Sequence, residues 1–200
     1  LATRVVGASI STDANNEDNK TNVGAAVGLN VADVSNRAMI GAGATVEADG
    51  ITVKAVTPTG KTNDARVWAL AIGGGKSANG VAGSAGINVL VMDTDASVGQ
   101  GAHLTSLDGI AIEADNAIAY QNIAGGGGVG KKAGVGVAVA ANIIVQNTDA
   151  VIGKNVHADA KEILSVEADS SIAPLQLNIP GLSSLAPEIS SIAAGGGVST

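Results

Sequence analysis

Three stretches of the sequence are variants of one pattern, and this internal repetition constrains the fold more than any other feature. Each copy has an apolar segment with one asparagine, a polar segment that closes on a glycine, and a segment in which Ile or Val alternates with other residues. The asparagines are Asn30, Asn88 and Asn142, which lie 58 and 54 residues apart. Self-similarity at such a period is typical of proteins that stack like units.

The spacing inside each copy is conserved from one copy to the next. The closing glycine follows its asparagine by 11 residues each time, at Gly41, Gly99 and Gly153. The chain therefore divides into repeats at approximately 22–72, 73–124 and 125–173, an apolar insertion at 174–187, and the start of another repeat at 188–200. We expect a single segment, 1–200, of a longer protein.

Composition limits how the core can be built. The chain has 46% hydrophobic residues but only one Trp, one Tyr and no Phe, and it contains 28 glycines and no cysteine. A core that lacks aromatic bulk has to be filled by Ala, Val, Ile and Leu, and glycine permits the close approach of backbones that such a core needs. The net charge of −7 disfavours nucleic acid as a partner, because phosphates need a basic face.

Alternation with a period of two predicts strands along most of the chain. Residues 110–114 and 135–139 are examples, and we expect their β-branched side chains to face inward. No apolar run is long enough for a membrane helix, so we expect no membrane insertion. The predicted fold is all-β, a parallel β-helix or β-solenoid of three imperfect repeats of 54–58 residues. We expect each repeat to supply about three rungs of roughly 18–20 residues, with strands stacked ~4.8 Å apart.

Glycine has two predicted structural uses. Asp49-Gly50 and Asp108-Gly109 occupy matched positions between strands, where Gly would supply the positive φ of a tight corner. Residues 71–85 and 123–138 read as Gly-rich hairpins, each a strand, a polar turn and a return strand. Glycine on alternate positions of these strands predicts a second layer packed almost directly on the backbone.

Acidic residues recur in pairs two positions apart. Two such carboxylates point to the same side of a strand, so pairs on neighbouring rungs are candidates for Ca²⁺, which needs 6–8 oxygen ligands. The candidates are Asp93, Asp95, Glu113, Asp115, Glu167 and Asp169. The alternative is a solvated outer face. Lys54 stands in the first copy where Glu113 and Glu167 stand in the others, so the sequence favours no metal and no cofactor.

Other candidate sites are weaker. His103 and His157 each follow a closing glycine by four residues, and Thr45 takes that place in the first copy. They form either an exposed polar ladder or a weak metal-binding or pH-sensitive pair. Residues 125–132 approach a phosphate-binding loop but lack the Ser or Thr after the lysine and the following helix. No nucleophile elbow or aromatic platform is present, so we assign no catalytic residues and expect no enzyme.

Three phrases carry a resemblance to a known family. These are Ala38–Val46, Ala48–Ala55 and the Gly-rich Ala124–Val129. They resemble segments of large secreted filamentous adhesins, the filamentous-haemagglutinin-like and leukotoxin-type exoproteins of Gram-negative bacteria. The resemblance implies a β-helical stalk that is secreted, displayed at the cell surface and involved in virulence. It implies host-cell or matrix surfaces as partners, with self-association or filament formation, and it supplies no catalytic residues.

Three classes of function follow from these observations. The first is a structural stalk segment of a cell-surface or secreted adhesin. The second is a binding module that contacts a host or matrix partner through the Gly-rich hairpins or the 174–187 insertion. The third is a β-helix polysaccharide-active enzyme, for which an aromatic-lined cleft with clustered carboxylates would be the evidence.

Overall fold

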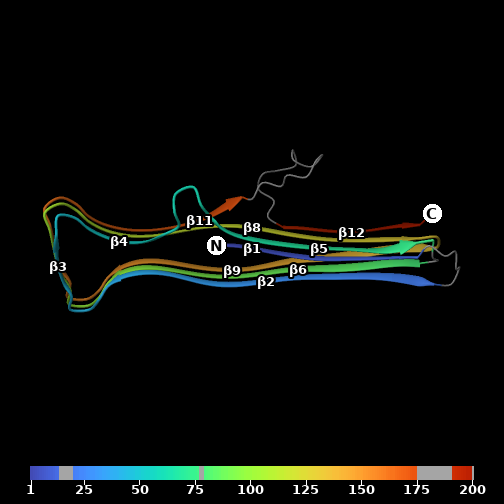
Figure 1. The fold of residues 1–200 in the computed structure, drawn as a ribbon, viewed down its shortest axis with the longest axis horizontal. Helices are drawn as coiled ribbons and strands as arrows, with labels where there is room; N and C mark the ends of the chain where they lie inside the picture. The colour runs from blue at the N-terminus through green and yellow to red at the C-terminus, as the bar shows by residue number, and fades with distance from the viewer. Residues whose placement is uncertain (14–19, 77–78, 175–190, 200) are drawn as a thin grey trace.

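The computed structural model describes residues 1–13, 20–76, 79–174 and 191–199, and their regular structure consists of β-strands (Figure 1). The all-β class is therefore confirmed. The strands are β1 (Ala2–Asp13), β2 (Thr21–Ile40), β3 (Thr45–Ala48), β4 (Ile51–Val56), β5 (Asn63–Gly75), β6 (Asn79–Val98), β7 (His103–Ser106), β8 (Ile110–Gly130), β9 (Ala133–Ile152), β10 (His157–Ala160), β11 (Leu164–Pro174) and β12 (Ser191–Ser199).

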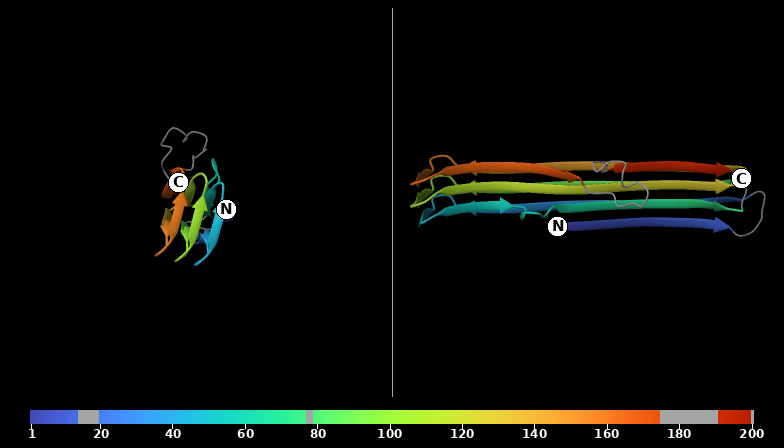
Figure 2. Two further views of the ribbon diagram at one scale, coloured as in Figure 1. Left: turned by 90° about the vertical axis from the view of Figure 1, so that its left-hand side faces the viewer. Right: turned by 90° about the horizontal axis from the view of Figure 1, so that it is seen from above.

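These strands form three sheets, and every strand pair in them is parallel. Sheet A has six strands, β1, β4, β5, β8, β11 and β12, while sheet B holds β2, β6 and β9 and sheet C holds β3, β7 and β10. The chain passes from sheet A to sheet B to the short sheet C, and then returns to sheet A beside the strand it left (Figure 2). Figure 1 shows sheets A and B as two long layers that sheet C joins at one end.

One circuit through the three sheets takes a whole repeat. Asn30 pairs with Asn88, and Asn88 pairs with Asn142, so strands separated by 58 and 54 residues are direct neighbours. The expectation of three rungs of roughly 18–20 residues per repeat is therefore wrong. Strands of 20 residues, such as β6 and β9, are far longer than the usual five or six, and they use up the length that shorter rungs would have shared.

The core changes in character along the strands. Next to sheet C it is filled by large apolar side chains, including Leu104, Ile110 and Ile112, none of which is exposed. Further along, the buried side chains of sheets A and B include Leu90, Met92 and Ile118. At the far end the buried cluster consists only of Ala26, Ala71 and Ala82. The two long sheets accordingly lie further apart near sheet C and converge away from it (Figure 1).

At the narrow end, glycine and alanine replace large side chains on the inward faces. A Cβ added to Gly126 of β8 would collide with the backbone oxygen of Val137 in β9, and one added to Gly136 would collide with that of Gly126. The glycines therefore place two sheets backbone against backbone, as the alternating pattern predicted. The strands on either side of each turn belong to different sheets, so the predicted Gly-rich hairpins are wrong as paired hairpins; they are arches between sheets A and B.

This close approach inverts the expected orientation of the β-branched residues. Val53, Ile110 and Ile112 face inward beside sheet C, as expected. Val135 and Val137 of β9 face outward and are 48% and 57% exposed, because the glycines between them occupy the space against sheet A. The expectation that 135–139 turns its β-branched residues inward is therefore wrong.

The positive φ angles lie at a different corner from the one the sequence suggested. Gly50 and Gly109 do not have positive φ, whereas Gly43 and Gly101 have φ of 67° and 70°, in the turns that enter sheet C. The third circuit has Asn155 at the equivalent place, with φ of 55°. Asn tolerates the left-handed region better than most residues, so the same corner forms without glycine.

Two loops interrupt sheet A beside the continuous strand β8. The first is residues 57–62, between β4 and β5, which spans two residues of β8. The second lies between Pro174, which pairs with Tyr120, and Ser191, which pairs with Asn122. The predicted apolar insertion at 174–187 falls in this second loop and lies, beyond Pro174, outside the described residues. Gly197 and Val198 pair with Gly128 and Val129, as the repeated Gly-rich phrase predicted.

Candidate functional site

Four of the predicted calcium candidates form two ladders on the outer face of sheet A. Glu113 pairs with Glu167, and Asp115 pairs with Asp169, on neighbouring strands. Lys54 pairs with Glu113 on the other side, and its Nζ lies 2.7 Å from the Glu113 carboxylate. The prediction that Lys54 breaks this acidic ladder is confirmed. The carboxylates line one shallow hollow beside the 57–62 loop.

The remaining two candidates, Asp93 and Asp95, lie on the outer face of sheet B. Asp93 accepts a hydrogen bond of 2.7 Å from the side-chain amide of Asn147. Asp95 is flanked by Arg37 and Asp149 on the neighbouring strands. In the part of the chain that the structure describes, no three His, Asp or Glu side chains are arranged to hold a metal ion. The sequence pattern thus brings the carboxylates together in pairs but not into a coordination shell.

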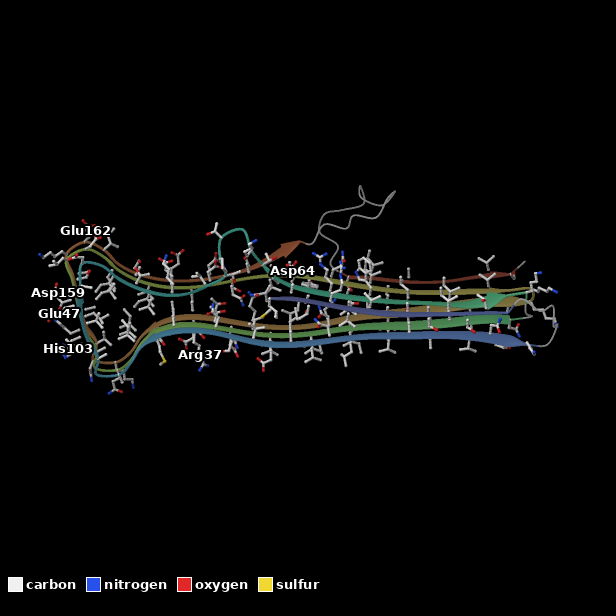
Figure 3. All side chains as sticks on the ribbon, in the orientation of Figure 1. Arg37, Glu47, Asp64, His103, Asp159 and Glu162 are labelled. Atoms are coloured by element: carbon white, nitrogen blue, oxygen red, sulfur yellow. The ribbon has the colours of Figure 1, made fainter. Side chains whose placement is uncertain are left out.

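The two histidines are neighbours on sheet C. His103 pairs with His157, their ring centroids are 5.9 Å apart, and Thr45 completes the ladder. The predicted ladder is thus observed, and Figure 3 shows His103 at the same end of the molecule as Glu47 and Asp159. At the next corner Glu162 stacks on Asp108. Their hydrogen bond and mutual repulsion raise the pKa of Glu162 above its ordinary value.

The Gly-rich segment at 125–132 lacks the context of a phosphate-binding loop. Strand β8 continues through Gly130, Lys131 and Lys132 form the turn, and β9 begins at Ala133. A phosphate-binding loop leads from a strand into a helix, whose N-terminal amides hold the anion. The turn here leads from one sheet to the other, so the backbone amides of β9 are used in strand pairing.

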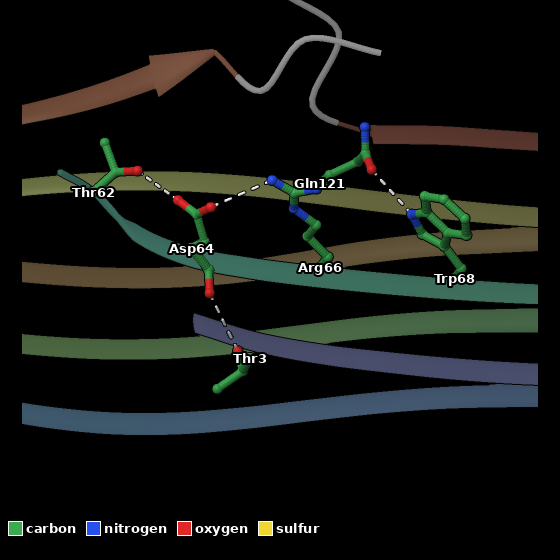
Figure 4. Close-up of polar contacts among 6 residues, drawn as sticks. All are labelled: Thr3, Thr62, Asp64, Arg66, Trp68 and Gln121. Carbon is green, nitrogen blue, oxygen red and sulfur yellow. Dashed lines mark hydrogen bonds and ion pairs between the residues drawn. The ribbon is translucent and has the colours of Figure 1, made fainter. Parts of the chain in front are cut away.

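The one tryptophan lies within a polar network on the outer face of sheet A (Figure 4). Trp68 Nε1 donates a 3.0 Å hydrogen bond to Gln121 Oε1, and the Arg4 guanidinium carbon lies 5.5 Å from the ring centroid. Arg66 pairs with Asp64 at 3.3 Å on the same strand. These contacts occupy the polar groups of the ring and of its neighbours, so the arrangement ties strands together and forms no cleft.

A buried row of amides is the polar feature that sequence reasoning did not assign a role. Asn30 donates to Asn88 at 2.8 Å along sheet B. Asn122 crosses from sheet A and donates to the backbone oxygens of Gly86 and Ala141 at 2.9 Å each. Asn88 and Asn122 are fully buried. The equal spacing of the sequence asparagines indicated this row, but only the opposition of the two sheets places Asn122 in it.

The outer face of sheet B carries an uncharged region that we call the apolar face. It comprises five rows across the three strands, 23–31 of β2, 81–89 of β6 and 135–143 of β9, in which every second residue points outward. The outward residues are Val23, Ala25, Val27, Leu29, Val31, Val81, Gly83, Ala85, Ile87, Val89, Val135, Val137, Val139, Ala141 and Ile143. Val27, Val31 and Val139 are 67%, 65% and 54% exposed.

A contiguous uncharged surface of this kind marks an interaction site more often than a solvated surface. It is the strongest functional signal in the described part of the molecule. Sequence reasoning missed it because alternation alone does not say which of the two faces is inward.

Among the described residues, no helix has the length and apolar character to cross a membrane. No protein-family model, no curated protein and no solved structure matches the chain.

Proposed function

We propose that the chain is a structural segment of a secreted or cell-surface bacterial adhesin, of the filamentous-haemagglutinin-like or leukotoxin type that its phrases resemble. In this proposal the three repeats form a β-solenoid, with one circuit per repeat, that acts as a rigid scaffold and performs no catalysis. The observation that carries it is the register: equivalent residues of successive repeats are neighbours in all three sheets, as with Asn30, Asn88 and Asn142.

The scaffold role follows from how such a stack is stabilised. Each interior strand satisfies the backbone groups of the strands on either side, so every added circuit extends the same ladders. The buried amide row and the glycine layers also repeat from circuit to circuit, which fixes the register at several depths of the core. A cysteine-free protein exported into an oxidising environment can rely on this continuous hydrogen bonding in place of disulfides.

The location can be tested on the cells that produce the protein. An antibody raised against residues 1–200 should label intact cells or their culture supernatant, and external protease should remove the label. Labelling that appears only after the cells are lysed would reject the secreted location. The solenoid can be tested separately by hydrogen exchange: amides of the central strands β6 and β8 should be protected far longer than those of β2 and β9 at the ends of sheet B.

A further inference from the structure

We propose that the apolar face is the contact surface for a second copy of this chain, packed face to face and antiparallel in a two-fold dimer. The inference deepens the proposed scaffold role, because it needs the stacked sheet, but it does not depend on an extracellular location. It rests on the composition of the face, on its area and on the charges at its two ends.

The composition of the face is the reverse of what a solvated sheet shows. Of its fifteen outward positions, fourteen carry apolar side chains and one is Gly83, while the inward positions of the same rows are Gly, Ala, Ser and Asn. A sheet with one wet face places its apolar residues against the core and polar residues outside. Here the β-branched residues cover the outside, which suits packing against another sheet.

The area is sufficient for a weak specific dimer. Nine residues along each strand and three strands across give a footprint of about 30 Å by 14 Å, or roughly 420 Å² per copy and 840 Å² for two. The relief of the side chains, together with the adjoining Val91 and Val145, brings the total close to the ~1,000 Å² at which specific interfaces begin. We therefore expect a dissociation constant in the micromolar range for this chain.

The charges at the two ends of the face favour an antiparallel arrangement. Lys20, Lys131 and Lys132 lie just before the first rows of the face. Beyond its last rows the outward charges are Asp33, Asp93, Asp95 and Asp149, against a single Arg37. A two-fold axis through the middle row, at Ala85, brings the lysine end of each copy onto the acidic end of the other. A parallel arrangement would place like charges together.

A lipid surface fits the same face less well. Proteins that lie on membranes usually surround their apolar residues with Lys and Arg, which attract anionic headgroups. One end of this face is acidic, so it would be repelled by such a surface.

The arrangement can be tested with single cysteines, because the chain has none. In the antiparallel dimer, the variant Ala85→Cys should be linked to its own copy by a bismaleimide that spans two sheets about 10 Å apart. Ser97→Cys, twelve residues from the axis on the same strand, should not be linked, because the two sites would be about 80 Å apart. Linkage of both variants would show parallel packing, and linkage of neither would show no face-to-face packing. Either result overturns the proposal.

Sedimentation velocity over about 1–300 µM gives an independent measure of association. The paired change Val27→Thr and Val139→Thr keeps the β-branched shape but adds hydroxyls at the middle of the face, and it should weaken dimerisation at least about tenfold. Met39→Thr with Val151→Thr, on the same outer surface beyond the face, should leave it unchanged. Circular dichroism would confirm that both variants fold. Association that survives the first pair would place the contact elsewhere, for example at strand edges.

Two further results separate this inference from the proposed function. A monomeric chain with the strand content and slow exchange of the stack would reject the dimer and leave the scaffold role intact. Monomers that float with neutral phosphatidylcholine vesicles, and lose that binding in the Val27→Thr, Val139→Thr variant, would assign the apolar face to lipid and overturn the dimer.

Discussion

Two adjacent glycines of strand β8 provide a sharp test of the close packing between sheets A and B. A Cβ on Gly126 would meet the backbone of Val137, with its carbon and nitrogen atoms each 3.0 Å away and its oxygen closer still. A Cβ on Gly127, one residue later and on the opposite side of the strand, would meet nothing within 4 Å. Neither glycine has a positive φ. The changes Gly126→Ala and Gly127→Ala therefore differ only in the space available.

The magnitudes follow from this difference. Replacing Gly by Ala in a strand stabilises by about 0.5–1 kcal/mol when the site is open, which is the expectation for Gly127→Ala. At Gly126 the same gain is opposed by overpacking, which costs about 1–3 kcal/mol, and a backbone carbonyl cannot rotate away as a side chain can. The free energies of unfolding should therefore differ by about 1–3 kcal/mol, with Gly126→Ala the less stable variant.

Thermal unfolding followed by circular dichroism or calorimetry would measure this gap. For a chain of 200 residues, 1 kcal/mol corresponds to about 2–4 °C in Tm, so the two variants should melt about 2–10 °C apart. Gly136→Ala and Gly196→Ala form a second pair with the same contrast. Equal melting temperatures within a pair, or a greater loss at the open site, would refute the account in which sheet backbones touch.

Four other results are expected. Asn122→Ala should lower the free energy of unfolding by about 1–3 kcal/mol in urea titrations, because two buried carbonyl bonds are lost. Glu162 has a raised pKa, so its contribution favours the folded state at low pH and is lost as the pH rises through that pKa; NMR titration should show the shift, and Asp108→Asn should remove most of it. Millimolar Ca²⁺ should barely move the unfolding midpoint; a rise of many degrees that Asp115→Asn with Asp169→Asn abolishes would contradict this. Small-angle scattering of the monomer should give a radius of gyration above about 20 Å, against about 17 Å for a globular chain of this length, with no helical signal in circular dichroism.

The sequence predicts the register of the stack well and its orientation poorly. Aligning the repeats on Asn30, Asn88 and Asn142 predicts the neighbours in sheet B and also the neighbours of Lys54 in sheet A, because identical spacing requires identical pairing. The alternation of Val and Gly in 135–139 is compatible with either face being inward. Which face is buried depends on the opposite sheet, where Gly126 leaves no space for a side chain. That information lies in a different segment of the chain.

The candidate sites show the same division. Pairs of carboxylates and the histidine ladder follow from strand spacing, and both are observed where spacing predicts them. The apolar face and the position of Asn122 follow from the opposition of two sheets, which no local pattern encodes. The number of circuits per repeat also escaped prediction, because nothing in a 54-residue period distinguishes one wide circuit from three narrow ones.

The width of the circuit decides what a protein of this type gains from each repeat. One repeat of 54–58 residues lengthens the stack by a single strand spacing of about 4.8 Å, so a reach of 100 Å would take roughly 1,150 residues. The same repeat adds a band about 70 Å wide to each outer face, because β8 has 21 residues. Added repeats therefore supply surface faster than they supply length. If the apolar rows continue in further repeats, each circuit enlarges the area available for packing against a second copy, and the weak dimer expected of this chain becomes a stable lateral contact in a longer one.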